Sequence, residues 1–284
     1  MKNILIFGAN SLVGKLIVRD LNQLEEKINL RIFSRNREES KEYIDFKNLK
    51  EIERINIKEN SIIVNVSPIW LFVAFLKRLS EENESQAKNI KKLISFSSTS
   101  IITKKYSSNK EDKLLVNNLE KSELLLEKLC IKNNIDFNII RPSMIYGKIE
   151  NMIDKNLDFI LNIMRKVPFI FLPVSTGKRQ PIHASKLSLL VLKIIRDDIK
   201  SNSKIISTGG DKIITYSNML FLLKKSLSKD DKAKRCKIII IPDSLFNILI
   251  IPLLVFKKNK FDSYYRIYSD LSDFKPIYKL INTK

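Results

Sequence analysis

The sequence predicts an α/β protein in which parallel strands form a doubly wound sheet, followed by a smaller C-terminal cap. Three observations predict it. Short apolar runs alternate with helical patterns through the first half of the chain. A glycine turn joins the first apolar run to a helix, and the regular alternation ends near Gly147. We therefore expect a sheet domain over 1–147 and a cap over 148–284, leaving open that strands of the second part return to the sheet.

The strands are expected where the chain is apolar over four to eight residues, as in strands buried on both faces. In the first half they are expected at 3–9, 29–34, 52–57, 61–66, 92–96 and 136–140, of which 52–57 is the weakest. Helical spacing of apolar residues predicts helices at 13–24, 71–79 and 112–133.

After Gly147 helical runs mix with short strands. Helices are expected at 149–167, 185–197 and 217–227, with a strand at 204–208. A tail of this kind covers the carboxyl edge of a doubly wound sheet, where ligands bind. The second part is therefore expected to help form a binding site.

Composition excludes several functional classes. The net charge is +20, but 39 of the 51 basic residues are Lys and they are spread along the whole chain without a nucleic-acid recognition motif. No specific nucleic-acid partner is expected, because charge alone gives only non-specific attraction. Cys130 and Cys236 are too few for a disulfide framework, and the single histidine, His183, leaves almost nothing for a metal site. Since the chain enters an apolar strand at once, we expect no secretory signal and a cytoplasmic location.

The glycine turn is the clearest functional motif. The first strand leads into a helix through Gly8, Ala9, Asn10, Ser11, Leu12, Val13 and Gly14. A turn of this kind places the pyrophosphate of a dinucleotide at the helix N-terminus, so these residues, Ala9 apart, are the predicted cofactor site. Ser11 stands where a middle glycine normally lets the backbone approach the pyrophosphate. The alternative is a turn kept only for packing.

The end of the second strand bears on which dinucleotide binds. An NAD site would place an acidic residue there, but the chain has Ser34 and Arg35. The planar guanidinium suits a 2′-phosphate, so NADP(H) is favoured and NAD(H) is the alternative. Arg35 could equally be one more solvated cation of a basic protein.

Three further segments complete a family pattern: Ile94–Thr99, Asn138–Gly147 and Arg179–His183. With the glycine turn they resemble the extended short-chain dehydrogenase/reductases, the nucleotide-sugar epimerases and dehydratases. The resemblance implies a Rossmann fold with a nucleotide-sugar-binding cap. It also implies site residues: Thr99 in the catalytic site, Ser98, Arg179 and His183 toward the substrate, and Arg141 and Pro142 near the cofactor.

The family's catalytic pair is missing from its expected place. The resemblance implies a Tyr and a Lys four residues apart on the helix before Arg141, with a Glu at the place of Glu123. Counting back from Glu123 puts the Lys position at Leu119 and the Tyr position at Leu115. Tyr106, in a polar loop and followed four residues later by a Lys, is the substitute that we name as a catalytic candidate.

Two classes of function follow from this departure. The first is an NAD(P)-binding oxidoreductase or epimerase that transfers hydride at a carbon of a nucleotide-sugar with atypical catalytic residues. The second is a non-catalytic NADP(H)-binding regulatory or accessory protein. A homodimer is left open.

The C-terminal part holds a cationic stretch at 224–237 and an apolar stretch at 238–256, followed by more lysines. Two interpretations stay open. The first is a hydrophobic cap element of a Lys-rich protein, which buries the leucines and isoleucine of the apolar stretch inside the cap. These residues are Leu245, Ile248, Leu249, Leu253 and Leu254. The second, since cations flank an apolar segment, is peripheral contact with an anionic membrane through 224–258, at the inner surface.

Overall fold

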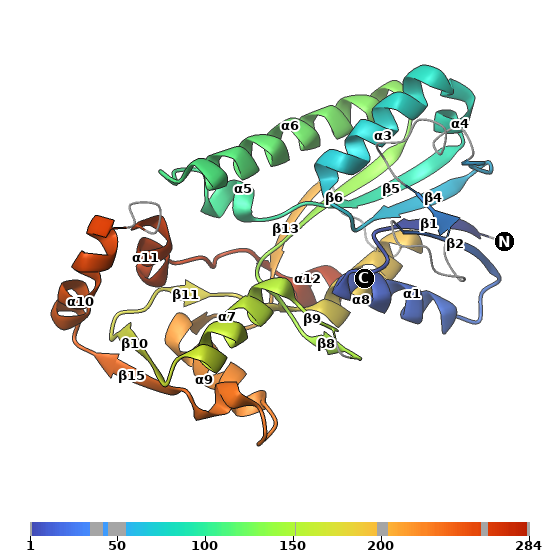
Figure 1. Ribbon diagram of the computed structural model, residues 1–284. Coiled ribbons are helices and arrows are strands. Elements are labelled where there is room, and N and C mark those ends of the chain that lie inside the picture. Colours follow the sequence, from blue (N-terminus) through green and yellow to red (C-terminus); the bar gives the residue numbers. More distant parts are fainter. Residues whose placement is uncertain are drawn as a thin grey trace.

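The computed structural model describes residues 2–34, 42–44, 55–150, 152–197, 204–256 and 261–282. In these residues, parallel strands form one sheet in the order β16-β13-β6-β5-β4-β1-β2-β3 (Figure 1). The strands are β1 (Lys2–Phe7), β2 (Ile28–Ser34), β3 (Glu42–Tyr43), β4 (Ser61–Asn65), β5 (Ile90–Phe96), β6 (Asp136–Pro142), β13 (Ile205–Gly209) and β16 (Lys275–Pro276). The doubly wound sheet predicted from the alternation of strands and helices is confirmed.

The central strands are apolar because helices cover both of their faces. All five side chains of β4 are buried, and β1 lies between β4 and β2. Phe7 and Phe33 occupy paired positions of β1 and β2, and their rings stack at 4.7 Å. This aromatic pair lies at the carboxyl ends of β1 and β2, where the turn from β1 into α1 begins.

Helices on opposite faces of the sheet bury two separate parts of the core (Figure 1). On one face lie α3 (Ile69–Glu82) and α6 (Lys110–Lys132), with the short α4 (Glu84–Lys88) and α5 (Ser100–Thr103) beside them. On the other face lie α1 (Leu12–Asn22), α8 (Ala184–Ile195) and α12 (Ile277–Ile281).

Residues after 147 contribute both to the sheet and to the cap. β13 pairs with β6 and β16 pairs with β13. The elements of the cap are α7 (Lys155–Lys166), β10 (Phe169–Pro173), α9 (Tyr216–Ser226), a 3₁₀ turn (Lys232–Arg235), β15 (Lys237–Ile241), α10 (Asp243–Phe256) and α11 (Phe261–Tyr268). Short pairs link cap and sheet: β7 (Ile145–Tyr146) with β12 (Ile182–His183), β8 (Lys148–Ile149) with β9 (Met152–Ile153), and β11 (Lys178–Arg179) with β14 (Ile214–Thr215).

Two predicted elements are wrong in their described parts. In the predicted strand 52–57, Ile55 and Ile57 are buried but belong to no strand, and the residues before Ile55 lie outside the described ones. The helix expected at 149–167 begins only at Lys155, because β8 and β9 form a hairpin before it and Asp154 caps the helix by accepting from the Asn156 N–H at 2.9 Å.

The buried alternative for the apolar stretch is also wrong where the structure describes it. Leu245, Ile248 and Leu249 are exposed on α10, while Phe246 is buried. The side chains of Leu253 and Leu254 lie outside the described part.

No helix in the described ranges is both long enough and apolar enough to cross a membrane.

Candidate functional site

A cleft of about 550 Å³ opens at the carboxyl ends of β1, β2, β4 and β5. This edge is where ligands bind in doubly wound sheets. Its polar lining includes Asn10, Ser11, Ser34, Ser67, Ser97, Ser98, Asp154 and Lys155. Its apolar lining includes Leu12, Val13, Phe33, Ile69, Trp70, Leu115, Leu119 and Pro142. Of the predicted cofactor residues, the cleft brings together Gly8, Asn10, Ser11, Leu12, Val13, Ser34 and Pro142.

The turn between β1 and α1 has the backbone that a pyrophosphate site requires. Gly8 has a φ of +82°, and a Cβ there would lie 2.5 Å from the Ser67 backbone nitrogen. A Cβ on Gly14 would lie 2.5 Å from the carbonyl oxygen of Gly8. Both positions therefore need glycine, one for conformation and closeness to β4, the other for the packing of α1 on β1.

Ser11 replaces the usual middle glycine without blocking the helix N-terminus. Its hydroxyl donates to the Gly8 carbonyl at 2.9 Å and accepts from the Gly14 N–H at 3.1 Å, which caps α1. Among the described residues, no group accepts from the N–H groups of Leu12 and Val13. The first turn of α1 also holds no acidic residue, so it presents free donors and a positive dipole end to an anion.

Asn10 connects this turn to the end of β2. Its side-chain amide donates to the Ser34 hydroxyl at 2.8 Å. Asn10 belongs to the turn, and Ser34 is the last residue of β2, directly before Arg35. Arg35 itself lies outside the described residues.

Gly8→Ala is expected to remove dinucleotide binding and to lower the melting temperature, because alanine disfavours this φ and its Cβ meets backbone rather than a movable side chain. Calorimetric titration with NADPH and thermal melts measure the two effects. Ser11→Gly is the matched control in the same turn: glycine caps helices nearly as well as serine, so stability should fall by only a few tenths of a kcal/mol. Undiminished binding by Gly8→Ala would contradict this role for the turn.

Helix α6 places two leucines where the family resemblance implies Tyr and Lys. Leu115 and Leu119 both line the cleft, and Leu119 is also 3% exposed within the core beneath α3. Among the described lining residues there is neither a tyrosine nor a histidine. The wall that would carry the proton-transfer pair is therefore apolar.

Below the leucines, Glu123 binds Arg141. The Nε of Arg141 donates to the two carboxylate oxygens of Glu123 at 2.9 and 3.1 Å, and Nη2 donates to the same carboxylate. The Ser97 hydroxyl also donates to Glu123. Arg141, predicted to lie near the cofactor, does not line the cleft, and this buried network joins α6, β5 and β6 beneath it.

The predicted catalytic residues lie outside the cleft lining. Thr99 is buried, and its hydroxyl donates to the Pro142 carbonyl at 3.1 Å. Tyr106 is 91% exposed in the loop after α5. Ser98, predicted to face substrate, does line the cleft, and its hydroxyl donates to the Ser100 hydroxyl at 3.0 Å.

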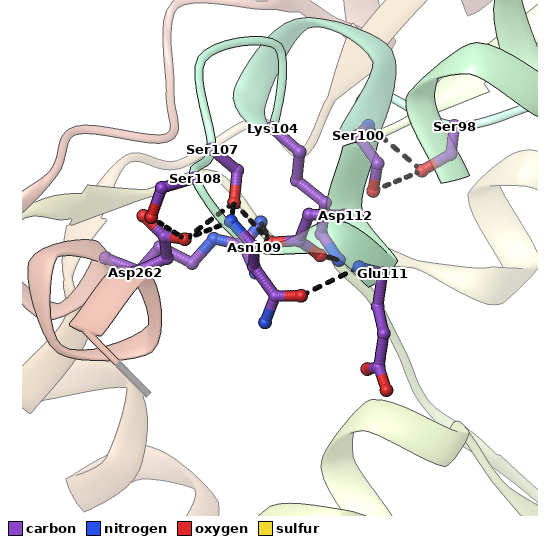
Figure 2. Close-up of polar contacts among 10 residues, drawn as sticks. Ser98, Ser100, Lys104, Ser107, Ser108, Asn109, Glu111, Asp112 and Asp262 are labelled. Carbon is purple, nitrogen blue, oxygen red and sulfur yellow. Dashed lines mark hydrogen bonds and ion pairs between the residues drawn. The ribbon is translucent and has the colours of Figure 1, made fainter. Parts of the chain in front are cut away.

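A polar cluster joins this loop to the cap (Figure 2). The carboxylate of Asp262, on α11, accepts from the hydroxyls of Ser107 and Ser108 at 3.0 and 2.8 Å and from the Asn109 N–H at 2.6 Å. Asp112 at the start of α6 accepts from Lys104 at 2.6 Å. Burial acts to raise the pKa of both carboxyl groups, but these donors hold each pKa below its ordinary value. The cluster fixes α11 against the N-terminal end of α6.

Arg179 and His183 lie on the cap side, away from the cleft lining. The guanidinium of Arg179 donates to the carbonyls of Lys178 and Ser269 at 2.7 and 2.6 Å and to that of Arg266, so it holds the segment after α11. His183 caps α8 and lines a second cavity of about 410 Å³. Burial lowers its pKa, which favours the neutral ring.

Four polar residues of the cleft are not among the predicted site residues: Ser67, Ser97, Asp154 and Lys155. Ser67 follows β4, while Asp154 and Lys155 begin α7. Asp154 could have been found as a helix cap, because an Asp before an amphipathic run is an N-terminal signal. Ser67 had no such local signal.

No model of a known protein family matches the chain. No curated protein sequence matches it either.

The structure is nevertheless similar to solved structures of sugar-nucleotide enzymes. A dTDP-glucose 4,6-dehydratase from Bacillus anthracis, in complex with NAD, shares 15% identity over 86% of this chain and 85% of its own, with a TM-score of 0.58. A GDP-mannoheptose C4 reductase from Campylobacter jejuni with NADP bound shares 12% over 85% and 87%, with a TM-score of 0.60.

A nucleoside-diphosphate-sugar epimerase from Staphylococcus aureus shares 16% identity over 100% of this chain and 96% of its own, with a TM-score of 0.60. These likenesses show the fold: the chain has a Rossmann-type parallel sheet followed by a C-terminal cap, as the sequence predicts.

Proposed function

We propose that the protein binds a nicotinamide dinucleotide in the cleft and retains it as a ligand, without the Tyr–Lys hydride chemistry that the resemblance of its motifs implies. The free N–H groups of Leu12 and Val13 support binding of the pyrophosphate. The observation that carries the non-catalytic assignment is the apolar wall formed by Leu115 and Leu119. Leucine can neither take nor give a proton, so the usual base is missing.

The fate of the predicted catalytic residues supports the same proposal. Thr99 is hydrogen-bonded to the backbone and buried, and Tyr106 points into solvent. Neither side chain is placed to exchange a proton with a ligand in the cleft. A regulatory or accessory protein needs only the dinucleotide site.

A second candidate is an oxidoreductase or epimerase with atypical residues that acts on a nucleotide-sugar. The cleft favours it in one respect: Ser98, Asp154 and Lys155 line the cleft and could contact a substrate beside the dinucleotide. Solved structures of similar fold include a dehydratase, a reductase and an epimerase of nucleotide-sugars. Lys155 is then the residue that we would test as an acid.

One experiment decides between the two. The full chain is purified, and ligands released on denaturation are identified by mass spectrometry. The protein is then incubated with NADPH or NAD⁺ and dTDP-, UDP- or GDP-sugars while nicotinamide absorbance and sugar NMR are followed. We expect a retained dinucleotide and no sugar turnover. Turnover that Lys155→Ala abolishes would establish the second candidate instead, and absence of any dinucleotide binding would contradict both.

NADP(H) is the expected dinucleotide, because Arg35 follows the last described residue of β2. Arg35→Ala is expected to remove most of the preference for NADPH over NADH, by about 1–3 kcal/mol for a charge-assisted contact. Calorimetric titration of both cofactors into both proteins measures it. Arg37→Ala is the matched control two residues away. Equal affinities of the unmodified protein for the two cofactors would overturn the preference.

The location and the oligomeric state of the protein are also proposals. The proposed location is the cytoplasm, at the inner surface of a membrane. The proposed oligomer is a homodimer, which gel filtration with light scattering tests.

A further inference from the structure

The cap carries a helix that is apolar on nearly all sides yet exposed. α10 reads DSLFNILIIPLLVF. Of its large apolar side chains, Phe246 is buried at 3%, stacking on Tyr264 at 5.9 Å and meeting Tyr268 at 6.1 Å. On the outer side Leu245, Ile248 and Leu249 are 44 to 62% exposed. A helix that is apolar all round is normally buried, so α10 lacks a covering layer in the described molecule.

The apolar surface continues from α10 onto β10. α10 packs beside β10, and the Val174 N–H donates to the Ile241 carbonyl at 3.1 Å, which ties β10 and β15 to the start of the helix. Phe169 and Phe171 point to the same side of β10 with ring centroids 5.4 Å apart. We call this set the apolar face: Phe169, Phe171, Val174, Leu245, Ile248, Leu249 and Ile251, all exposed.

The charge beside the apolar face has one dominant sign. Exposed cations precede and begin β15: Lys225, Lys229, Lys232, Arg235 and Lys237. In sequence, Lys257, Lys258 and Lys260 follow α10, although they lie outside the described residues. Two cations of the predicted basic stretch are used internally, since Lys224 donates to the Cys236 carbonyl at 2.5 Å and Lys234 to the Leu227 carbonyl at 3.0 Å.

The nearby acids do not offset these cations. Asp231 is paired with Arg165 at 2.8 Å, and Asp243 accepts from the Ser175 N–H at 3.1 Å. Among the described residues, neither Asp230 nor Asp243 has an ion pair, so two such carboxylates oppose five exposed cations. An apolar face bordered by exposed cations matches a surface with an apolar interior and anionic head groups.

We propose that the apolar face attaches the protein reversibly to an anionic lipid bilayer, with α10 lying in the plane of the head groups. Fourteen residues of helix extend about 21 Å, less than the roughly 30 Å of a bilayer core, which fits a helix that lies on the surface. Phe169 and Phe171 would enter beside it, and the cations around β15 would contact the lipid phosphates. This attachment does not depend on the dinucleotide site.

Co-sedimentation with vesicles tests the proposal. The full chain is mixed with vesicles of phosphatidylcholine alone or with added phosphatidylglycerol, at low and at high salt. Binding is expected only to the anionic vesicles, and salt should weaken it because exposed charges are screened. Ile248→Glu should reduce partitioning about tenfold or more, since it replaces an inserted apolar side chain by a charge. Ile131→Glu, at an exposed apolar position of α6, is the matched control and should bind like the unmodified protein.

Two results would overturn the proposal. One is the absence of binding to anionic vesicles at low salt by a folded protein. The other is an equal loss of vesicle binding in Ile248→Glu and Ile131→Glu. Binding would then depend on the net charge of the protein and not on insertion of the apolar face. Light scattering of the same proteins adds an independent check: a dimer that Ile248→Glu dissociates, without vesicle binding, would make the face an interface between two copies and reject the bilayer.

Discussion

Glu123→Ala is expected to lower the free energy of unfolding by about 3–5 kcal/mol, the range found when one partner of a buried ion pair is removed. Glu123 is 4% exposed, and the side chain of Arg141 is 18% exposed. Removing the carboxylate leaves the guanidinium of Arg141 without its three hydrogen bonds and the Ser97 hydroxyl without its acceptor.

Chemical denaturation followed by circular dichroism measures this loss. Glu120→Ala, at an exposed position of the same helix, should change stability by no more than about 0.5 kcal/mol. The double variant Glu123→Met with Arg141→Met should recover much of the loss, because well-packed apolar side chains can replace a buried pair at little cost. A small effect of Glu123→Ala would mean that the network contributes little to holding β5, β6 and α6 together.

The parts of the fold that the sequence predicts well are those encoded over a few neighbouring residues. β4 and the glycine turn are examples. A short, mainly apolar run predicts a buried strand, and a glycine at the end of a strand predicts a tight turn. The strand expected at 52–57 is wrong in its described part, because apolar residues indicate burial but not which hydrogen bonds the backbone makes. Ile55 and Ile57 are buried in the core with residues of α3 and α6 but belong to no strand.

The candidate site shows the same limit. Its cofactor end could be predicted because β1 and the start of α1 are consecutive in the chain. The contacts of Asp262 with Ser107, Ser108 and Asn109 join residues more than 150 positions apart, and no local pattern marks them. The use of Arg179 as a backbone tether was equally hidden, because the sequence shows a cation but not the carbonyls around it.

Leu119→Ala is expected to lower the free energy of unfolding by about 2–5 kcal/mol, because it removes a buried side chain from the core between α6 and α3. Leu115 lies one turn earlier, is only half-buried and packs against the edge of the same cluster. Leu115→Ala should therefore cost less stability. Leu124→Ala, on the exposed side of α6, is the matched control and should cost little.

Both leucines also line the cleft, so their truncation tests what that wall does for a bound dinucleotide. If the wall packs against the dinucleotide, Leu115→Ala should weaken NADPH binding by about 1–2 kcal/mol through lost apolar contact while the protein stays folded. Thermal melts with and without NADPH separate the effects: Leu119→Ala lowers the melting temperature in both conditions, whereas Leu115→Ala mainly reduces the rise that NADPH produces. An unchanged NADPH-induced rise in Leu115→Ala would place the bound dinucleotide away from α6. The replacement of the family's Tyr would then be a matter of packing alone.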